Sequence, residues 1–376
     1  MTSYKDKQHF FYYLKSLDRV NATIIEGLAE HGPRNMSTLA KSIHLPITTV
    51  RFRLDKMIKN GYLLINANLN MPKLGLIKGF LVAESFLGRQ DALFKSILNT
   101  AYWKYIIRCY GKIDGYCAYF AFPFSYRTQL QKYFEEVAKM KILSDYRFFW
   151  VTNSMVVPPN FLWYDFERKE WRFQWEKWIS EILGAPNILP QTLRDPEEYS
   201  IIVDKTDLLI LKELEKNGVT TLKELTKIVE IAPSSICYRF KKHIIERSLI
   251  VDYNIDAYPY PFQVSDLYNF IIDFVSEKTL AKFVNASGKP FMISYAKVIG
   301  ENSLIANIYI LKTEFPNLIK SLNRLYSEDL IKNFFYLTLD STAYKRQTIS
   351  YEYFENGKWT YNHEEKIKKL QEISRI

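Results

Sequence analysis

The sequence predicts an α+β protein built as two tandem repeats, each a winged helix-turn-helix followed by a ferredoxin-like βαββαβ domain with an aromatic β-hairpin extension. Three observations support this prediction. A chain of 376 residues is too long for one ordinary core and should hold several domains. A hydrophobic content of 48% with 16% aromatic residues is typical of globular proteins. Residues 18–65 align without a gap onto residues 204–251.

The internal alignment has an offset of 186 residues and is identical at ten positions, Asp18/Asp204, Ile24/Ile210, Leu28/Leu214, Gly32/Gly218, Leu39/Leu225, Lys41/Lys227, Arg53/Arg239, Lys56/Lys242, Ile58/Ile244 and Leu63/Leu249. It resumes downstream, where residues 148–152 face 334–338 at the same offset. Further on, residues 165–167 face 353–355. We therefore interpret the whole chain as duplicated, with a seam rich in proline and polar residues near 184–198.

These patterns predict five regions along the chain. They are a first winged helix-turn-helix (1–70), a ferredoxin-like domain with its hairpin (71–183), a linker (184–203), a second winged helix-turn-helix (204–256) and a second ferredoxin-like domain with a hairpin and a C-terminal helix (257–376).

The first helix-turn-helix begins with helical apolar spacing over Val20–Glu30, which ends at His31-Gly32-Pro33. Ser37 is expected to cap a short second helix. Thr48 is expected to cap the third helix, and Ser234 takes the same role in the second repeat. After each third helix, residues 62–68 and 249–255 are expected to form the short strands of a wing.

A helical projection of each third helix separates an apolar face from a polar one. The predicted buried residues are Val50, Leu54, Met57 and Ile58 in the first repeat and Ile236, Phe240 and Ile244 in the second. The predicted outward residues are Thr49, Phe52, Lys56 and Lys59, and Ser235, Tyr238, Lys241 and Lys242. Residues 47–60 and 233–247 each have a net charge of +3, so positive charge concentrates in these helices.

Each helix-turn-helix is followed by the order strand, helix, strand, strand, helix, strand, which is the ferredoxin-like order. The predicted ranges are 77–86, 90–99, 103–110, 115–122, 126–139 and 146–152, and then 267–275, 277–286, 291–299, 303–310, 314–326 and 334–340. Aromatic hairpins follow at Trp163–Trp175 and Tyr351–Tyr361, the second turning on Asn356-Gly357. These hairpins either present a stacking or partner surface, or cover a sheet face or the contact between the halves.

Several classes of function find no support in the sequence. The three cysteines have no metal-site or disulfide spacing, so we expect no metal. The five histidines (His9, His31, His44, His243 and His363) are scattered, and no phosphate loop or nucleophile elbow occurs, so we expect neither a cofactor nor an enzyme. Without a long apolar run or a signal peptide, the chain is expected in the cytoplasm and not in a membrane.

The order of elements resembles the Lrp/AsnC family of feast/famine regulators, and the resemblance covers residues 18–155 and 204–342. The family pattern on the third helix, an apolar residue, two variable residues and arginine, is similar to Val50-Arg51-Phe52-Arg53 and Ile236-Cys237-Tyr238-Arg239. Residues 68–75 resemble the family linker. The resemblance implies two winged helices that enter successive major grooves of double-stranded DNA.

The family's glycine loop, with an aspartate three residues on, is similar to Gly111-Lys112-Ile113-Asp114. This implies a small-molecule effector site at Gly111 and Asp114, whereas the second repeat departs from the pattern with Gly300-Glu301-Asn302-Ser303. The resemblance also implies that ferredoxin-like domains pair. We expect them to pair within the chain, with a homodimer of chains as the alternative.

The residues predicted to contact DNA gather on the two third helices. They are Thr48, Thr49, Arg51, Phe52, Arg53, Lys56, Lys59, Ser234, Ser235, Tyr238, Arg239, Lys241 and Lys242. Three alternatives stay open: the basic face is only solvated, the two motif arginines (Arg53 and Arg239) pack and bond within the domain, or Phe52 and Tyr238 pack against the wing.

Sequence-specific DNA binding by a fused pseudo-dimer with two non-identical recognition helices is the predicted function. A second hypothesis is a factor that docks on the transcription machinery or on RNA without recognising sequence. Siroheme decarboxylases also resemble this architecture, and such an enzyme is the third reading.

Overall fold

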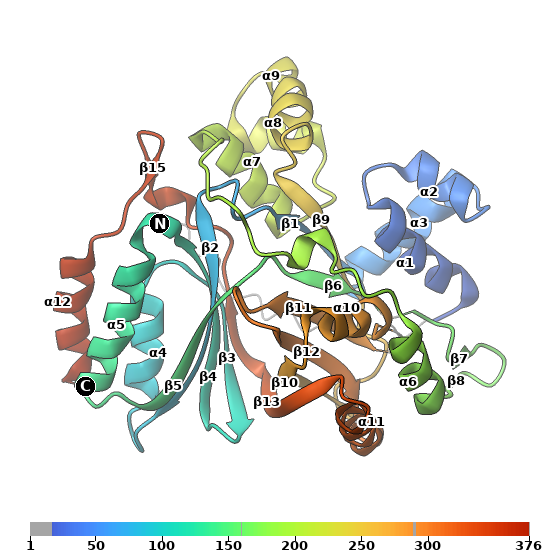
Figure 1. The fold of residues 1–376 in the computed structure, drawn as a ribbon. Helices are drawn as coiled ribbons and strands as arrows, with labels where there is room; N and C mark the ends of the chain where they lie inside the picture. The colour runs from blue at the N-terminus through green and yellow to red at the C-terminus, as the bar shows by residue number, and fades with distance from the viewer. Residues whose placement is uncertain (1–16, 159, 289–290, 376) are drawn as a thin grey trace.

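The computed structural model describes residues 17–158, 160–288 and 291–375 (Figure 1). Residues 1–16, with which the first predicted domain begins, lie outside the described residues, and so does His9. Within the described part, no helix is both long enough and apolar enough to cross a bilayer.

Two helix-turn-helix units, which we call the first head and the second head, stand on one side of a large sheet (Figure 1). The first head consists of α1 (Arg19–His31), α2 (Met36–Ser42) and α3 (Ile47–Lys59). The second consists of α7 (Lys205–Lys216), α8 (Leu222–Val229) and α9 (Pro233–Tyr238), and α9 continues as a π-helical segment over Arg239–Ile245. Asp18 and Asp204 cap α1 and α7 with their carboxylates.

The predicted hydroxyl caps are wrong. Helix α2 begins at Met36, so Asn35 precedes it, and its Oδ1 accepts from Thr38 N at 3.1 Å in place of Ser37. Neither α3 nor α9 has a side-chain cap, because α3 follows Pro46 and α9 has a proline in its first turn, where the fixed φ of proline favours helix entry. Thr48 and Ser234 therefore keep their hydroxyls free of a capping role.

The strands predicted for a wing both form, but they pair with each other. Strand β1 (Leu64–Leu69) runs antiparallel to β9 (Ile250–Asp256), and Ala67 lies opposite Tyr253. The result is one ribbon shared by the two heads in place of a separate wing on each. The apolar face of the ribbon packs on the heads, because Ile65 and Ile255 belong to the core of the first head.

One nine-stranded antiparallel sheet follows, in the order β5-β2-β4-β3-β13-β10-β12-β11-β6. Its strands are β2 (Leu76–Ser85), β3 (Trp103–Gly111), β4 (Gly115–Pro123), β5 (Leu143–Val151), β6 (Met155–Val157), β10 (Ser265–Phe274), β11 (Met292–Lys297), β12 (Ser303–Leu311) and β13 (Ile331–Arg346). The helices between them are α4 (Gln90–Asn99), α5 (Arg127–Lys139), α10 (Glu277–Ala286) and α11 (Phe315–Ser327). Each half contributes four strands in the ferredoxin-like order, within a few residues of the predicted ranges except that β13, predicted to end at 340, continues to Arg346.

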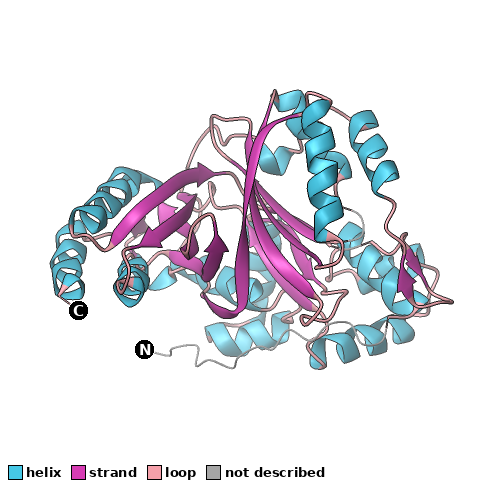
Figure 2. Cartoon of the chain, turned by 90° about the horizontal axis from the view of Figure 1, so that it is seen from below, coloured by secondary structure: helices cyan, strands magenta, loops and turns pink. Residues whose placement is uncertain are grey.

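The two ends of this sheet meet. Strand β6 follows β5 almost directly and pairs with β11. Thr152, the residue after β5, donates its N–H to the carbonyl of Lys297 at the end of β11, at 2.9 Å. At the other junction β3 pairs with β13. The faces turned away from the helices share one core, to which both halves contribute: Phe80, Val82, Ile107, Cys109, Ile113, Cys117, Val151, Ile271, Ala296, Val298, Ile305, Leu337 and Leu339. Figure 2 shows the strands between flanking helices.

The two aromatic hairpins form, and the helix that follows each hairpin covers the opposite half. Hairpin β7 (Tyr164–Asp165) and β8 (Glu170–Trp171) leads into α6 (Trp175–Gly184), which packs on α10 and α11. Hairpin β14 (Phe354–Glu355) and β15 (Lys358–Trp359) leads into α12 (His363–Ser374), which packs on α4 and α5. Trp178 Nε1 donates to Ser287 O at 2.8 Å, and Trp359 Nε1 donates to Leu74 O at 2.6 Å. The tryptophans therefore cover the contact between the halves.

Candidate nucleic-acid interface

Helix α3 presents the face that its periodicity predicts. Val50, Leu54 and Met57 are buried against the rest of the first head, and Ile58 is half-buried. The outward side chains are exposed, and they include Thr48, Arg51, Phe52, Lys56 and Lys59, with Thr49 half-buried. Phe52 is 66% exposed, which contradicts packing against a wing. Three cations and one aromatic ring thus share an open face.

The outward face of the third helix, which we call the reading face of its head, is built alike in the second head. Ile236 and Ile244 are buried and Phe240 is half-buried, while Ser234, Ser235, Tyr238, Lys241 and Lys242 are exposed. Lys242 Nζ lies 2.8 Å from Glu246 Oε1, so part of its charge is neutralised. Ser234, Ser235 and Tyr238 line a shallow hollow of about 430 Å³ together with Arg239 and His243. This hollow opens at the start of the helix that the resemblance assigns to DNA reading.

The first motif arginine is engaged inside its own head. Arg53 Nη1 donates to Asp18 Oδ2 at 2.7 Å, and Asp18 is the residue that caps α1. The side chain is 35% exposed. Of the two roles left open by the sequence, the contact favours the structural one: Arg53 fastens α3 to the beginning of α1.

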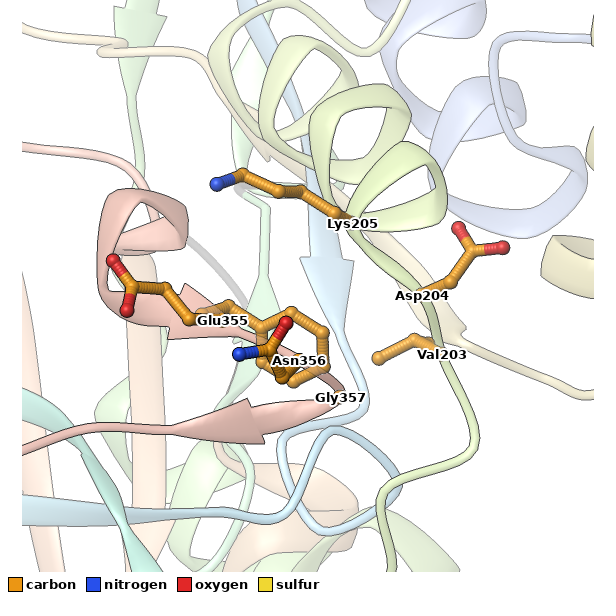
Figure 3. Close-up of a pocket in the computed structure, with 7 residues that line it drawn as sticks. Val203, Asp204, Lys205, Glu355, Asn356 and Gly357 are labelled. Atoms are coloured by element: carbon orange, nitrogen blue, oxygen red, sulfur yellow. The ribbon is translucent and has the colours of Figure 1, made fainter.

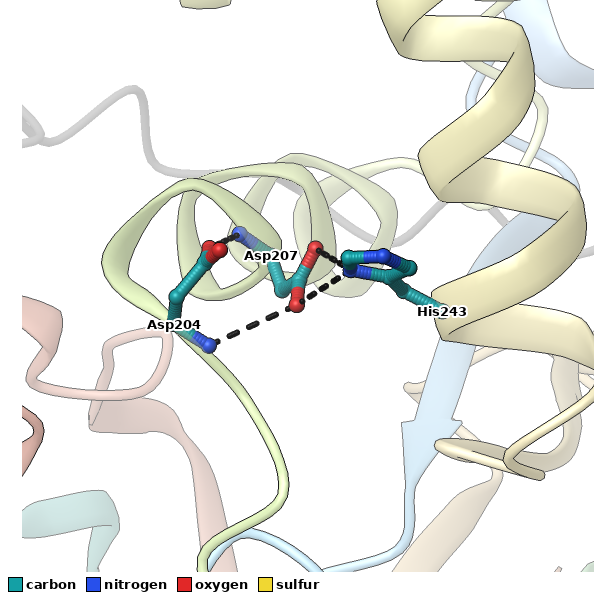
Figure 4. A group of neighbouring side chains, drawn as sticks. All are labelled: Asp204, Asp207 and His243. Carbon is teal, nitrogen blue, oxygen red and sulfur yellow. Dashed lines mark hydrogen bonds and ion pairs between the residues drawn. The ribbon is translucent and has the colours of Figure 1, made fainter.

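Arg239 has the same role in the second head, within a larger ion cluster whose other members, Asp204, Asp207 and His243, are drawn in Figure 4. Its Nη1 donates to Asp204 Oδ2 at 2.7 Å and to Asp207 Oδ1 at 2.8 Å. His243 Nδ1 lies 3.0 Å from Asp207 Oδ2, and Asp207 is only 1% exposed. The group of Asp204, Asp207 and His243 has ligand atoms close enough for a metal ion. The guanidinium already supplies the cation there, so the cluster is complete without one.

A second hollow, of about 440 Å³, lies between the two ends of the C-terminal half (Figure 3). Val203, Asp204 and Lys205 form one wall, and the turn of the β14–β15 hairpin forms the other. Asn356 and Gly357 have φ of 49° and 76°, as the predicted two-residue turn requires. Its lining offers one lysine and two carboxylates with no converging arrangement, so we assign it no chemistry.

The predicted effector loop joins β3 to β4. Gly111 adopts a φ of 119°, a conformation that favours glycine, and Asp114 forms an ion pair with Arg108. Arg108 also lies over the rings of Tyr110 and Tyr116. The carboxylate of Asp114 is thus paired within the loop. Effector binding here stays a prediction.

A polar layer beneath the ribbon was missed by the sequence reasoning. The ribbon's second face carries Asn66, Asn68 and Asp252 toward the sheet, where Asn68 Nδ2 donates to Asp252 Oδ1 at 2.8 Å. Lys104 Nζ lies 2.5 Å from Glu215 Oε1 of α7. Burial, and then the charge of Lys104, lower the pKa of Lys78 to about 8. The alternation of Asn and Asp along both strands was the available signal, but it was equally consistent with a solvated face.

Comparison with known proteins gives two kinds of likeness. A family model of winged helix-turn-helix DNA-binding domains matches residues 203–242. No curated protein matches the sequence. Among solved structures, siroheme decarboxylase NirDL has a TM-score of 0.51 at 12% identity, over 95% of this chain and 99% of that one. An AsnC family transcriptional regulator from Agrobacterium tumefaciens has a TM-score of 0.28 at 20% identity, over 36% of this chain and 89% of that one. LrpC of B. subtilis has a TM-score of 0.28 at 18% identity, over 35% of this chain and 92% of that one.

The full-length likeness overturns one expectation. The sequence led us to expect that the chain is not an enzyme, and this is wrong, because the protein whose fold matches almost the whole chain is a decarboxylase. Scattered histidines and missing motifs could not reveal this, since one architecture serves both regulators and enzymes. The chain carries a winged helix-turn-helix of the DNA-binding type within a fold that is similar, over its full length, to that of siroheme decarboxylase NirDL.

Proposed function

We propose that the chain is a DNA-binding transcriptional regulator, in which two halves of duplicated origin act as a fused pseudo-dimer with two unequal reading heads. The observation that carries the proposal is the open basic face on both third helices, with Arg51, Lys56 and Lys59 on one and Lys241 and Lys242 on the other. Cations neutralise DNA phosphates, while nearby hydroxyl and aromatic side chains reach base edges. The match of residues 203–242 to winged helix-turn-helix DNA-binding domains supports it.

The shared ribbon suggests how the heads act together. Because β1 and β9 pair residue for residue, neither head is free on a flexible linker. Two reading helices held in this way would enter major grooves at a fixed separation, as dimeric helix-turn-helix proteins do. The outward residues of the two helices differ: in the internal alignment, Arg51 corresponds to Cys237 and Phe52 corresponds to Tyr238. We therefore expect a two-part site whose halves are not identical in sequence.

Selection of bound fragments from random genomic DNA, followed by footprinting, tests this proposal. We expect two unequal half-sites and an affinity well above that for competing random DNA. Binding of RNA or of all DNA alike would support the reading as a factor that does not recognise sequence. Footprints with only symmetric half-sites would contradict two unequal heads.

A second candidate rests on the full-length fold likeness to siroheme decarboxylase NirDL. In a tetrapyrrole decarboxylation, a carboxylate leaves as CO₂ and a proton replaces it on the carbon. Lys104 of the polar layer is already paired with Glu215, so the candidate proton donor is Lys78, whose pKa is lowered by burial to about 8.

Incubation of the purified protein with siroheme under anaerobic conditions tests the second candidate. We expect a shifted Soret band on binding and CO₂ release with a matching loss of substrate mass. Lys78→Met should abolish CO₂ release, whereas Lys320→Met, on the exposed face of α11, should not. If siroheme neither binds nor changes, the decarboxylase candidate fails while the DNA proposal stands.

A further inference from the structure

One side chain of the first head reaches into the second. Arg34 lies in the loop between α1 and α2, and its Nη2 donates to Thr220 O at 2.8 Å. Its Nε donates to the hydroxyl of Tyr253 on the ribbon at 3.0 Å. The guanidinium carbon lies 4.8 Å from the centroid of the Phe240 ring. Because Phe240 is on the reading helix of the second head, Arg34 touches the element that positions the reading face.

These contacts fall on the approximate two-fold axis between the halves. Arg34 and Thr220 are 186 residues apart, which is the offset of the internal alignment. Ala67 and Tyr253, which lie opposite each other in the ribbon, have the same separation. At both places a residue meets the residue that stands at its own position in the other half.

Identical halves could not form this contact. A residue on a two-fold axis meets its own copy, so two arginines would repel each other there and two tyrosines would compete for the same space. In this chain the pairs are complementary: Arg34 faces a threonine carbonyl, and the large Tyr253 faces the small Ala67. Tyr253 also packs beside Gly218, where an added Cβ would lie 2.9 Å from the ring. The fit requires one copy of each half.

Resting on the proposed DNA-binding function, we propose that Arg34 fixes the separation and orientation of the two heads and thereby selects the half-site spacing that the protein accepts. The ribbon already holds the two heads together, and Arg34 adds a direct bridge from the first head to the third helix of the second. Its two hydrogen bonds and its ring contact point in different directions from a half-buried position, where charge-assisted bonds are strong, so they resist a change in the angle between the heads. It acts as a positioning residue and reads no base itself.

A head-to-head distance measurement tests the proposal without DNA. Cys237 is exposed on the second reading helix, while Cys109 and Cys117 are buried, so Cys237 is a natural site for a spin label. Arg51→Cys places a second label at the matching position of the first head. We expect a narrow distance distribution in this labelled protein and a broader or shifted one when Arg34→Thr is added. An unchanged distribution would overturn the proposal.

Matched DNA probes test the consequence for spacing. The full chain is titrated with the selected half-sites at their natural spacing and with single base pairs inserted or removed. In Arg34→Thr the preference for the natural spacing should fall about tenfold, the effect of losing a charge-assisted hydrogen bond, while affinity for one isolated half-site stays unchanged. Equal loss on all probes would contradict a role in spacing.

The control is Arg127→Thr. Arg127 also stacks on a ring, that of Phe124 at 4.2 Å, and donates to the backbone carbonyl of the same residue, but it lies at the start of α5, and both contacts are made to a residue outside the two heads. It should alter neither the distances nor the spacing preference. If the protein binds no DNA, the proposed function fails, and the label distances still decide whether Arg34 holds the heads together.

Discussion

The two heads have the same order of helices but differ in how the third helix is anchored to the first. In the first head one ion pair, Arg53 with Asp18, stands beside Asn21 and the buried Met57. At the matching positions the second head has Asp207 and His243, which enlarge the ion pair into a four-residue cluster. The helix α3 is regular, whereas α9 continues as a π-helical segment through this cluster. Both reading helices pack through apolar side chains, but the first is joined to its head by one ion pair and the second by a larger set of directional polar bonds.

This difference has a physical consequence. Apolar packing tolerates small shifts, because dispersion contacts have no strong directionality. A cluster with a buried carboxylate has one arrangement that satisfies all its members, and the loss of one member leaves the others unpaired. We therefore expect the second head to be the more sharply defined reader and the more sensitive to substitution.

The largest effect is expected from the motif arginines. Arg239→Ala leaves the buried Asp207 without its cation and should destabilise the second head by about 3 kcal/mol. Arg53→Ala breaks a pair whose side chains are 35% and 46% exposed, so the first head should lose at most about 1 kcal/mol. Urea denaturation combined with hydrogen exchange resolved by head measures both, with the exposed Arg51→Ala as the control. Equal losses would show that the heads are anchored alike.

The next largest effect is expected from the lysines on the two reading faces, which should contribute unequally to DNA binding. Lys56→Ala with Lys59→Ala should weaken DNA binding on all sequences and reduce the slope of log affinity against log salt by about 2, since each phosphate contact contributes roughly 0.9. Lys241→Ala with Lys242→Ala should have a smaller effect, because Lys242 already pairs with Glu246. Fluorescence anisotropy at several salt concentrations gives the slopes. Lys320→Ala is the control, and an unchanged slope in the first pair would exclude that face.

The two strands of the ribbon differ in charge, and this difference makes the stability of the protein depend on pH. The first half contributes neutral Asn66 and Asn68 to its polar face, while the second contributes Asp252 and Asp256. Burial raises the pKa of Asp256 above its usual 3.8. The folded state therefore holds this proton more tightly than the unfolded state, and stability falls as pH rises from 3.8 through the raised value.

Asp256→Asn should accordingly stabilise the protein at neutral pH, with a gain that disappears below pH 3.8, where the carboxyl is protonated in both states. Chemical denaturation at a series of pH values measures the gain. Asp266→Asn, on the partly exposed start of β10, is the control. A gain that does not vary with pH would show that charge burial is not its cause.

The smallest effect on stability is expected from the exposed aromatics. Phe52 is 66% and Tyr238 is 60% exposed, so replacement of either by alanine should change stability by less than about 0.5 kcal/mol. Each should instead alter base preference in the half-site of its own head. Repeating the DNA selection with both variants checks this. Altered preference in both half-sites from one variant would contradict independent heads.

Much of the local structure could be predicted because it depends on neighbours in sequence. Val50, Leu54 and Met57 repeat with helical spacing, and they are buried as predicted. Apart from the longer β13, the strands and helices of both ferredoxin-like orders begin and end within a few residues of expectation, and Asn356-Gly357 forms its turn. In the candidate interface, the exposure of Lys56 and Lys59 likewise followed from which side of α3 is apolar.

The sequence could not show which strand, helix or counterion each element contacts in the fold. A strand pattern shows which face is buried but not which strand lies beside it, so the pairing of β1 with β9 was read as a wing. A C-terminal helix was predicted and α6 was not, and the sequence did not show that each of these helices covers the opposite half. Likewise, an arginine in a motif shows a charge without its counterion, and only the folded chain brings Arg53 to Asp18 and Arg34 to Thr220.

The sequence by itself thus determined the elements, their buried faces and the positive charge of the reading helices. The tertiary structure alone decided the closure of the sheet, the exchange of covering helices and the complementary contact between the heads. The reason is that helical and strand periodicities are properties of a few neighbouring residues. The contacts that join the halves connect residues far apart in the chain, and their energy depends on a geometry that exists only after folding.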